Sequence, residues 1–416
     1  MKTGMFSTLR RLGLVWIIPA ALGVVNIVTT VRNATPLTQP WQDSNGVLLD
    51  FRDLVVLPGR FLIAGGNPYD PALYLAANPW AQEFDPYLPS WLLISIAIGW
   101  LPLAASALVY LVAVCALSFA TCKMLARWIS PAQAWWLGPA IASWGQIWFP
   151  MRVLGSSFIC VCGFALLMWQ LAKGADRRSS WFGAVGLAVL VIKPQLGVPV
   201  ALFLLAYGLW QLVLRAIVVQ VAASLPTMVA CTIAAGGPAQ FVDSIIRDVQ
   251  HASSGASPTG LGISESFRTD VAGLYTRVVG EVPGVWLYAV VVTVFVGLLV
   301  FVALVKPRQE LLPAIVVMGV YLLPVNLSYD IALMIVPAAA AAALLVRHKD
   351  VHTLILVVLT AIPIAHLHRI TLALGLDKTP ADVADVACVF LAGAWAAFLS
   401  MRTRGTAYQS SQIGSE

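Results

Sequence analysis

The chain has 416 residues, of which 60% are hydrophobic and only 11% charged, and its mean hydropathy is +0.86. A water-soluble domain cannot bury that much apolar surface, so the composition excludes one and indicates a polytopic membrane protein. The formal net charge of +6 does not indicate a nucleic-acid partner, because the basic residues lie at the ends of apolar runs, where membrane topology explains them.

Apolar runs of about 17–24 residues recur along the chain, which is the length of a transmembrane helix and about twice that of a barrel strand. We therefore predict an all-α polytopic protein with one integral membrane domain over residues 1–416 and about 12 spans. The spans are expected near residues 12–30, 104–122, 132–149, 153–171, 181–192, 196–214, 216–235, 285–305, 311–325, 331–346, 352–368 and 384–400.

The distribution of basic residues predicts the orientation of these spans. Lys2, Arg10 and Arg11 precede the first apolar run, which we interpret as an uncleaved first helix with a cytoplasmic N-terminus. Lysine and arginine then gather in the connections on the same side as this N-terminus, whereas acidic residues gather on the other side. An even number of spans places both termini in the cytoplasm.

Two connections on the outer side are longer than the others. The first, residues 32–103, contains a polar stretch rich in carboxylates and then a short apolar run between Pro89 and Pro102, which predicts a re-entrant or interfacial segment. The second, residues 236–283, has a centre rich in glycine, serine and proline. That composition predicts a mobile lid or acceptor clamp, or a plain connector.

Several charged residues lie close to predicted span ends. Asp50 and Asp53 follow the first span, Lys193 interrupts an apolar run, and Asp330 begins a late span. Charged residues at membrane depth are costly and are often functional. Each also has a structural alternative: a surface ion pair, a lysine that extends to the interface, or an acid at a helix N-terminus.

The polar stretch of the first loop carries a recognisable pattern, DFRDLVVLPGRFLIAGGNPYDPALY, with a Gly59-Arg60 pair and then Gly-Gly-Asn-Pro-Tyr-Asp at residues 65–70. It resembles glycosyltransferase family 87, a family of polytopic transferases in the GT-C superfamily. Further elements that look like those of the family follow in order at residues 84–94, Gly145-Gln146, Lys193-Pro194-Gln195 and Tyr329-Asp330. The resemblance extends over about residues 10–340.

This resemblance implies a GT-C-like helical bundle with its active site on the outer face of a plasma membrane. It also implies a polyprenyl-phosphate-linked sugar donor, most often mannose, a lipid or glycan acceptor, and a catalytic aspartate in the first outer loop. That role falls on Asp50, with Asp53 as the alternative. No phosphate-binding loop for a nucleotide is evident, which agrees with a lipid-linked donor.

Glycosyl transfer to a hydroxyl needs a base, and one carboxylate is enough when the configuration inverts. The departing lipid phosphate needs positive charge. The residues expected to bind the donor phosphate are Lys193, Arg152, Arg369, His366 and Arg60. Those expected to contact the sugar or acceptor are Asn67, Tyr69, Gln195, Tyr329 and Asp330. Because these cations supply the counter-charge, no metal or other cofactor is expected.

Two other classes of protein fit the composition. A transporter or lipid-linked-sugar flippase would have a similar number of spans, but internal repeats are not evident, and the polar residues gather at span ends rather than at mid-membrane. A structural partner in an envelope-assembly complex would not depend on Asp50 or Asp53 except for stability. Assays of sugar transfer discriminate the enzyme from both.

Overall fold

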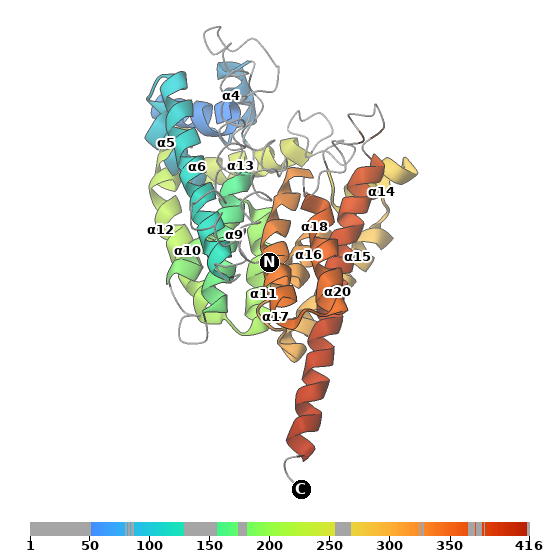
Figure 1. Cartoon of the computed structure of the whole chain (residues 1–416). Helices are drawn as coiled ribbons and strands as arrows, with labels where there is room; N and C mark the ends of the chain where they lie inside the picture. The colour runs from blue at the N-terminus through green and yellow to red at the C-terminus, as the bar shows by residue number, and fades with distance from the viewer. Residues whose placement is uncertain are drawn as a thin grey trace.

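The computed structural model describes residues 51–79, 81, 84, 87–128, 156–173, 181–253, 268–323, 326, 328–364, 371, 377 and 379–413. These residues form a helical bundle without β-strands (Figure 1). The predicted all-α membrane fold is confirmed in this general form. The spans expected at 12–30 and 132–149 lie outside the described residues, as does most of the predicted mobile segment after His251.

Five described helices are long and apolar enough to cross a membrane. They belong to α6 (Leu103–Trp128), α12 (Trp210–Ala235), α15 (Val285–Val305), η6 with α17 (Ser328–Met334 and Ile335–His348) and α20 (Thr379–Ile413). Shorter apolar helices are α9 (Ser157–Ala172), α10 (Trp181–Val191), α11 (Pro194–Tyr207), α16 (Leu312–Leu322) and α18 with η7 (Val351–Ala361 and Ile362–Ile364). Each of the ten overlaps a predicted span, although α6 and α20 extend beyond the predicted ends at residues 122 and 400. One boundary between two spans was misplaced.

That boundary lies between α11 and α12. The prediction that a span continues to residue 214 was wrong, because α11 ends at Tyr207 and α12 begins at Trp210. Gly208 ends α11 with φ of 93°, a left-handed conformation that glycine adopts without steric cost. Arg215 therefore lies inside α12 rather than at the end of a span.

The helices differ in how deeply they are buried. The alanine-rich helix α17 is buried along most of its length, because small side chains allow α18, α16, α9 and α6 to pack around it. In contrast, α12 and α15 expose valine, leucine and isoleucine side chains over much of their length. Exposed apolar faces of this size are those that lipid covers in a membrane protein.

The connections gather at two opposite ends of the bundle. The upper end, as oriented in Figure 1, is formed by η3 (Phe51–Val56), α3 (Leu57–Ile63), α4 (Pro71–Ala77), α5 (Trp91–Gly99), α13 (Pro238–Ser253), α14 (Val271–Val279), Asn326 and the start of η6. The lower end is formed by residues 206–209, 305–312, 347–353 and 399–402. The two predicted outer loops therefore contribute to the same end.

Candidate functional site

The first loop begins with a short π-helical turn that contains Asp53. The Asp53 side chain is fully buried, and its Oδ2 accepts a hydrogen bond of 3.0 Å from Nη2 of Arg52. The Tyr74 hydroxyl donates to the Asp53 carbonyl oxygen at 2.7 Å, and the Trp91 indole donates to the Leu54 carbonyl at 2.7 Å. Such turns are frequent at functional sites, and here two side chains hold this one in place.

Burial, and secondarily the charge of Asp53, raise the pKa of Tyr74 well above its usual range. Tyr74 therefore stays protonated at neutral pH and remains a hydrogen-bond donor to the Asp53 backbone. This bond orients the turn that carries Asp53, so Tyr74 is a positioning residue for the carboxylate.

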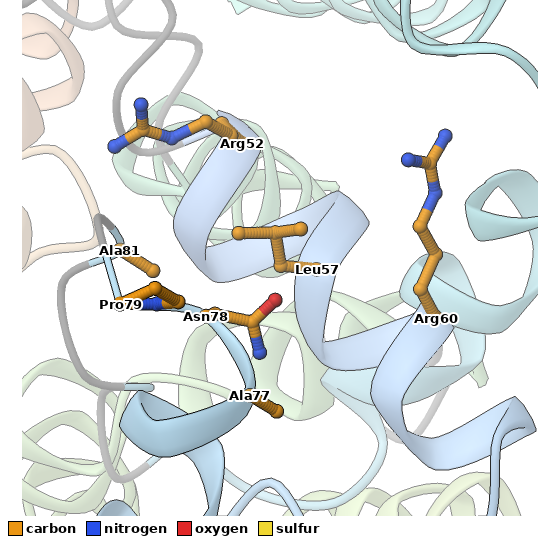
Figure 2. Close-up of a pocket in the computed structure, with 7 residues that line it drawn as sticks. All are labelled: Arg52, Leu57, Arg60, Ala77, Asn78, Pro79 and Ala81. Carbon is orange, nitrogen blue, oxygen red and sulfur yellow. The ribbon is translucent and has the colours of Figure 1, made fainter. Parts of the chain in front are cut away.

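A cavity of about 290 Å³ opens beside this turn. Its lining residues are Arg52, Leu57, Arg60, Ala77, Asn78, Pro79 and Ala81. Figure 2 shows the guanidinium groups of Arg52 and Arg60 on either side of Leu57. Among the lining residues these are the two that carry charge, so the cavity attracts anions.

Arg60 is positioned by the packing of α3 on α5. Its Nε donates to the Gly99 carbonyl at 2.8 Å and its Nη2 to the Leu101 carbonyl at 2.7 Å, at the end of α5. The preceding Gly59 allows this contact, because a Cβ there would lie 2.1 Å from the Ser95 carbonyl oxygen. The Gly59-Arg60 pair thus has a structural reason: one residue lets the helices touch and the other caps the second helix.

The Asn67-Pro-Tyr-Asp70 segment fastens this region to α13. Asn67 Nδ2 donates to Ser244 Oγ at 2.7 Å, and Asp70 pairs with Arg247 at 3.2 Å. The Tyr69 hydroxyl donates to the Tyr87 carbonyl at 2.7 Å. Asn67 and Tyr69 are buried in these contacts and do not line the cavity, so their role as sugar ligands stays a prediction.

Lys193 and Asp330, which are 137 residues apart, form a buried ion pair. Lys193 Nζ lies 3.2 Å from Asp330 Oδ1 and donates to Ser157 Oγ at 2.8 Å, while Ser157 Oγ donates to the same Asp330 oxygen at 3.0 Å. The three residues come from the start of α11, the start of α9 and η6. The structure thus joins two predicted site residues and adds Ser157, which no sequence pattern singled out.

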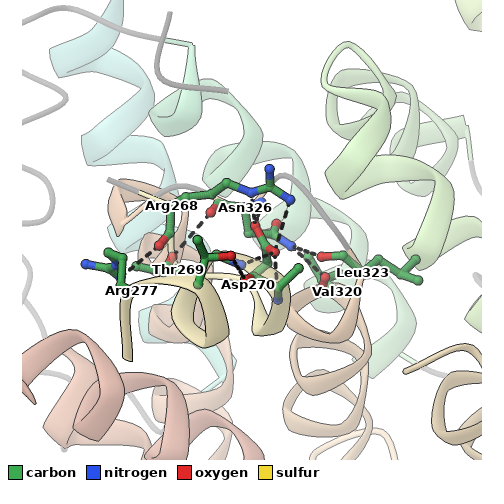
Figure 3. Close-up of polar contacts among 10 residues, drawn as sticks. Arg268, Thr269, Asp270, Arg277, Val320, Leu323 and Asn326 are labelled. Carbon is green, nitrogen blue, oxygen red and sulfur yellow. Dashed lines mark hydrogen bonds and ion pairs between the residues drawn. The ribbon is translucent and has the colours of Figure 1, made fainter. Parts of the chain in front are cut away.

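A second buried network surrounds Asp270 at the start of α14 (Figure 3). Asp270 Oδ1 accepts from the backbone amides of Ala272 and Gly273, both at 3.1 Å, and Oδ2 pairs with Arg268 at 2.7 Å. The backbone N–H of Asn326 donates to Oδ2 of the same carboxylate at 3.3 Å. Sequence reasoning missed this network, although an aspartate just before an apolar run is the usual signal of a helix N-cap.

The Asp270 network connects the second loop to the segment that carries Asp330. The Thr269 amide donates to the Asn326 carbonyl at 2.8 Å, and Asn326 Nδ2 donates to the carbonyls of Val320 and Leu323 at the end of α16. Because Asp330 follows Asn326 by only four residues, a shift of the second loop would move Asp330 and its partner Lys193. The network therefore connects the second loop to the segment that carries Asp330.

The remaining predicted residues are not all placed. Asp50, Arg152, His366 and Arg369 lie outside the described residues, as does the side chain of Tyr329. Gln195 is half-buried in the first turn of α11, two residues after Lys193. Within the described ranges no three His, Cys, Asp or Glu side chains come together as metal ligands.

Comparisons of the chain with protein-family models, with curated proteins and with solved structures found no match.

Proposed function

We propose that the chain is a membrane-embedded, inverting glycosyltransferase that moves a hexose, first of all mannose, from a polyprenyl-phosphate donor to a lipid or glycan acceptor. The proposal includes a GT-C-like bundle of about 12 spans in a plasma membrane, with both termini cytoplasmic and the upper end outside. One observation carries it: Asp53 is held by Arg52, which together with Arg60 lines an anion-attracting cavity at one end of an apolar bundle.

The proposed reaction is a single displacement. An acceptor hydroxyl oxygen attacks the anomeric carbon, the bond from that carbon to the phosphate oxygen breaks, and the hydroxyl proton passes to the carboxylate of Asp53 or Asp50. The electron pair of the broken bond leaves with the polyprenyl phosphate. Arg52 and Arg60 stabilise the charge that develops on this phosphate, as positively charged groups do in other transfers to and from phosphate.

Arg52 has two roles in this scheme. In the free protein its guanidinium pairs with the buried carboxylate of Asp53. When the donor phosphate enters the cavity, the guanidinium gains a second anion to bind. Sharing Arg52 with the phosphate weakens its contact with Asp53, which leaves a carboxylate oxygen available to accept the proton of the acceptor hydroxyl.

Lys193 fits a supporting role better than direct phosphate binding. Its ammonium group is already bound by Asp330 and Ser157 inside the bundle. The ion pair and Ser157 hold the starts of α9 and α11 against η6 at the upper end of the bundle. Lys193 is a phosphate ligand only if the donor displaces one of these partners.

The same ion pair favours a second candidate function, a transporter or flippase for a lipid-linked sugar. Charged pairs buried between membrane helices mark transport pathways in many carriers. This reading needs Lys193 and Asp330 to separate during transport, whereas the enzyme needs them to stay paired. Sugar transfer to an acceptor by the purified protein distinguishes the two.

The test is transfer of radiolabelled mannose from polyprenyl-phosphomannose to a membrane lipid extract by the purified full-length protein in detergent. Asp53→Asn should lower the rate by about 10²–10⁴-fold if Asp53 is the base, and Asp50→Asn should do so if Asp50 is. Asp243→Asn is the matched control, because Asp243 lies on α13 at the same end with 66% of its side chain exposed. Equal rates in all four proteins would contradict the proposal for both aspartates.

A second experiment follows if the wild-type protein does not transfer mannose from this donor. A panel of other polyprenyl-phosphate sugars is then tested with the same acceptor extract. If none is transferred, while the protein in sealed vesicles moves a lipid-linked sugar across the bilayer, the transporter replaces the enzyme as the proposed function.

A further inference from the structure

A second cavity, of about 270 Å³, lies at the lower end of the bundle, opposite the proposed active site. Its charged and titratable lining residues are Arg308, His348, Asp350, His352 and Arg402. They come from the connection before α16, from the continuous stretch that ends α17 and begins α18, and from α20. Side chains from three separate segments thus converge on one cavity that the proposed function does not use.

The charges around this cavity favour an anion. Glu310 is bound by Arg347 at 2.7 Å and lies 4.0 Å from Arg308, so its charge is largely balanced by Arg347. Arg402 makes no ion pair or side-chain hydrogen bond with another residue that the structure describes. Asp350 is the one acid in the lining, and two arginines outweigh it even when both histidines are neutral.

Asp350 is also occupied within the protein. Its Oδ1 accepts a hydrogen bond of 2.9 Å from the Thr353 amide, as the N-cap of α18. This bond lowers the pKa of Asp350, so the carboxylate remains charged and directed at the helix end near neutral pH. A ligand with negative charge therefore meets Arg308 and Arg402 as its principal partners.

The packing of α18 on α20 forms one wall of the cavity. Trp395 Nε1 donates to the His352 carbonyl at 2.9 Å, and the two rings lie 5.7 Å apart. Trp395, Leu399 and Arg402 recur at intervals of four and three residues, so they lie on one face of α20. Nδ1 of His352 is buried and has no hydrogen-bond partner in the part of the chain that is described, which leaves a polar atom for a ligand or water to satisfy.

Exposed apolar side chains lie next to the lining residues in the sequence. Val351 is 61% exposed, Leu354 48% and Met401 52%. In a membrane these residues contact acyl chains, whereas the arginines lie at the headgroup level. Basic pockets between helices at a membrane surface are a known way of holding phosphate-bearing lipid headgroups.

We infer that this cavity is a binding site for a phosphate-bearing anion, with Arg308 and Arg402 as its main contacts. The ligand chemistry is a phosphate group with net negative charge, carried by an anionic lipid headgroup or by a soluble phosphate. The site is separate from the cavity of Arg52 and Arg60, so this inference does not depend on the proposed glycosyl transfer.

The experiment uses native mass spectrometry of the purified full-length protein, titrated in one arm with phosphatidylglycerol in mixed micelles and in the other with inorganic phosphate. Each basic side chain near an anionic headgroup strengthens binding about fivefold. The double variant R308Q/R402Q should therefore bind phosphatidylglycerol about 25-fold more weakly. If the wild-type protein binds phosphatidylglycerol but not inorganic phosphate, the site is one for a lipid headgroup. If it binds inorganic phosphate alone, the site is one for soluble phosphate.

Lys349→Gln is the matched control, because Lys349 is exposed in the same turn, carries the same charge and does not line the cavity. It should bind as the wild type does. Equal weakening by K349Q and by R308Q/R402Q would show that only general charge matters and would overturn the inference. No binding in either arm would also overturn it. The single variant R402Q, which breaks no ion pair or side-chain hydrogen bond among the described residues, gives the same comparison if the double variant is unstable.

Discussion

The two ends of the bundle use the same kinds of charged residue in opposite ways. At the upper end, Lys193 and Asp330 pair with 2% and 0% of their side chains exposed. At the lower end, Arg347 and Glu310 pair at a shorter distance, 2.7 Å, but with 49% and 16% exposed. By distance alone the second pair would be the stronger interaction. Burial, however, decides how much stability is lost when one partner is removed.

This difference shows at which end of the bundle stability depends on paired charges. When an exposed ion pair is broken, water hydrates both charged groups, so the free energy of unfolding falls little. A buried pair has no water to replace the lost partner, so the remaining charge is stranded. The upper end, where several carboxylates and cations are buried, is therefore built to hold fixed positions, while the lower end keeps its cations available to ligands.

The largest expected effect comes from breaking the buried pair. Lys193→Met leaves Asp330 charged and uncompensated and should lower the free energy of unfolding by about 3–5 kcal/mol. Titration with a denaturing detergent measures this change. The double variant K193M/D330L should recover most of the loss, because an apolar pair of similar volume is often tolerated. If the double variant is as unstable as K193M, the ion pair is not the cause.

Asp270→Asn tests the second buried network. The amide keeps an oxygen for the N-cap of α14 but removes the charge that pairs with Arg268, and hydrogen bonds to charged groups contribute about 1.5–3 kcal/mol. The free energy of unfolding should fall by that amount in the same titration. Because this network connects the second loop to Asp330, proteolysis between α13 and α14 should also become faster. An unchanged rate of proteolysis would separate the network from the position of the loop.

Gly59→Ala tests the contact of α3 with α5 that positions Arg60. The new Cβ would lie 2.1 Å from the Ser95 carbonyl oxygen, so the helices must move apart, at a cost of about 1–3 kcal/mol. Gly297→Ala is the control, since nothing lies within 4 Å of its Cβ position. In the interior of α15 it should stabilise the protein by about 0.8–1 kcal/mol. Loss of stability in both variants would mean that the contact of α3 with α5 is not special.

Arg347→Gln should have the smallest effect, because the pair that it breaks is exposed. The free energy of unfolding should change by less than about 1 kcal/mol. Glu310 is then free to approach Arg308, so phosphatidylglycerol should bind somewhat more weakly to the lower cavity. A large loss of stability would show that the contrast between the two ends does not depend on burial.

Much of the fold was predictable from the sequence because a membrane span is a local property. The helix α15 reproduces its apolar run, and Lys306 and Arg308 follow its end as expected. The boundary between α11 and α12 was missed, since hydropathy continues through Gly208 and only the left-handed conformation there shows the break. The first loop was recognised as important, but its folding into η3, α3 and α4 was not predicted.

The candidate site shows the same division. The sequence by itself determined the membrane character, the positions of most helices and the unusual charges, because hydropathy and the cost of a charge depend only on a residue and its neighbours. The contact of Lys193 with Asp330, the cavity shared by Arg52 and Arg60, and the cavity shared by Arg308 and Arg402 became visible in the folded protein alone. Those partnerships join segments far apart in the chain, and the packing of the helices is what brings them together.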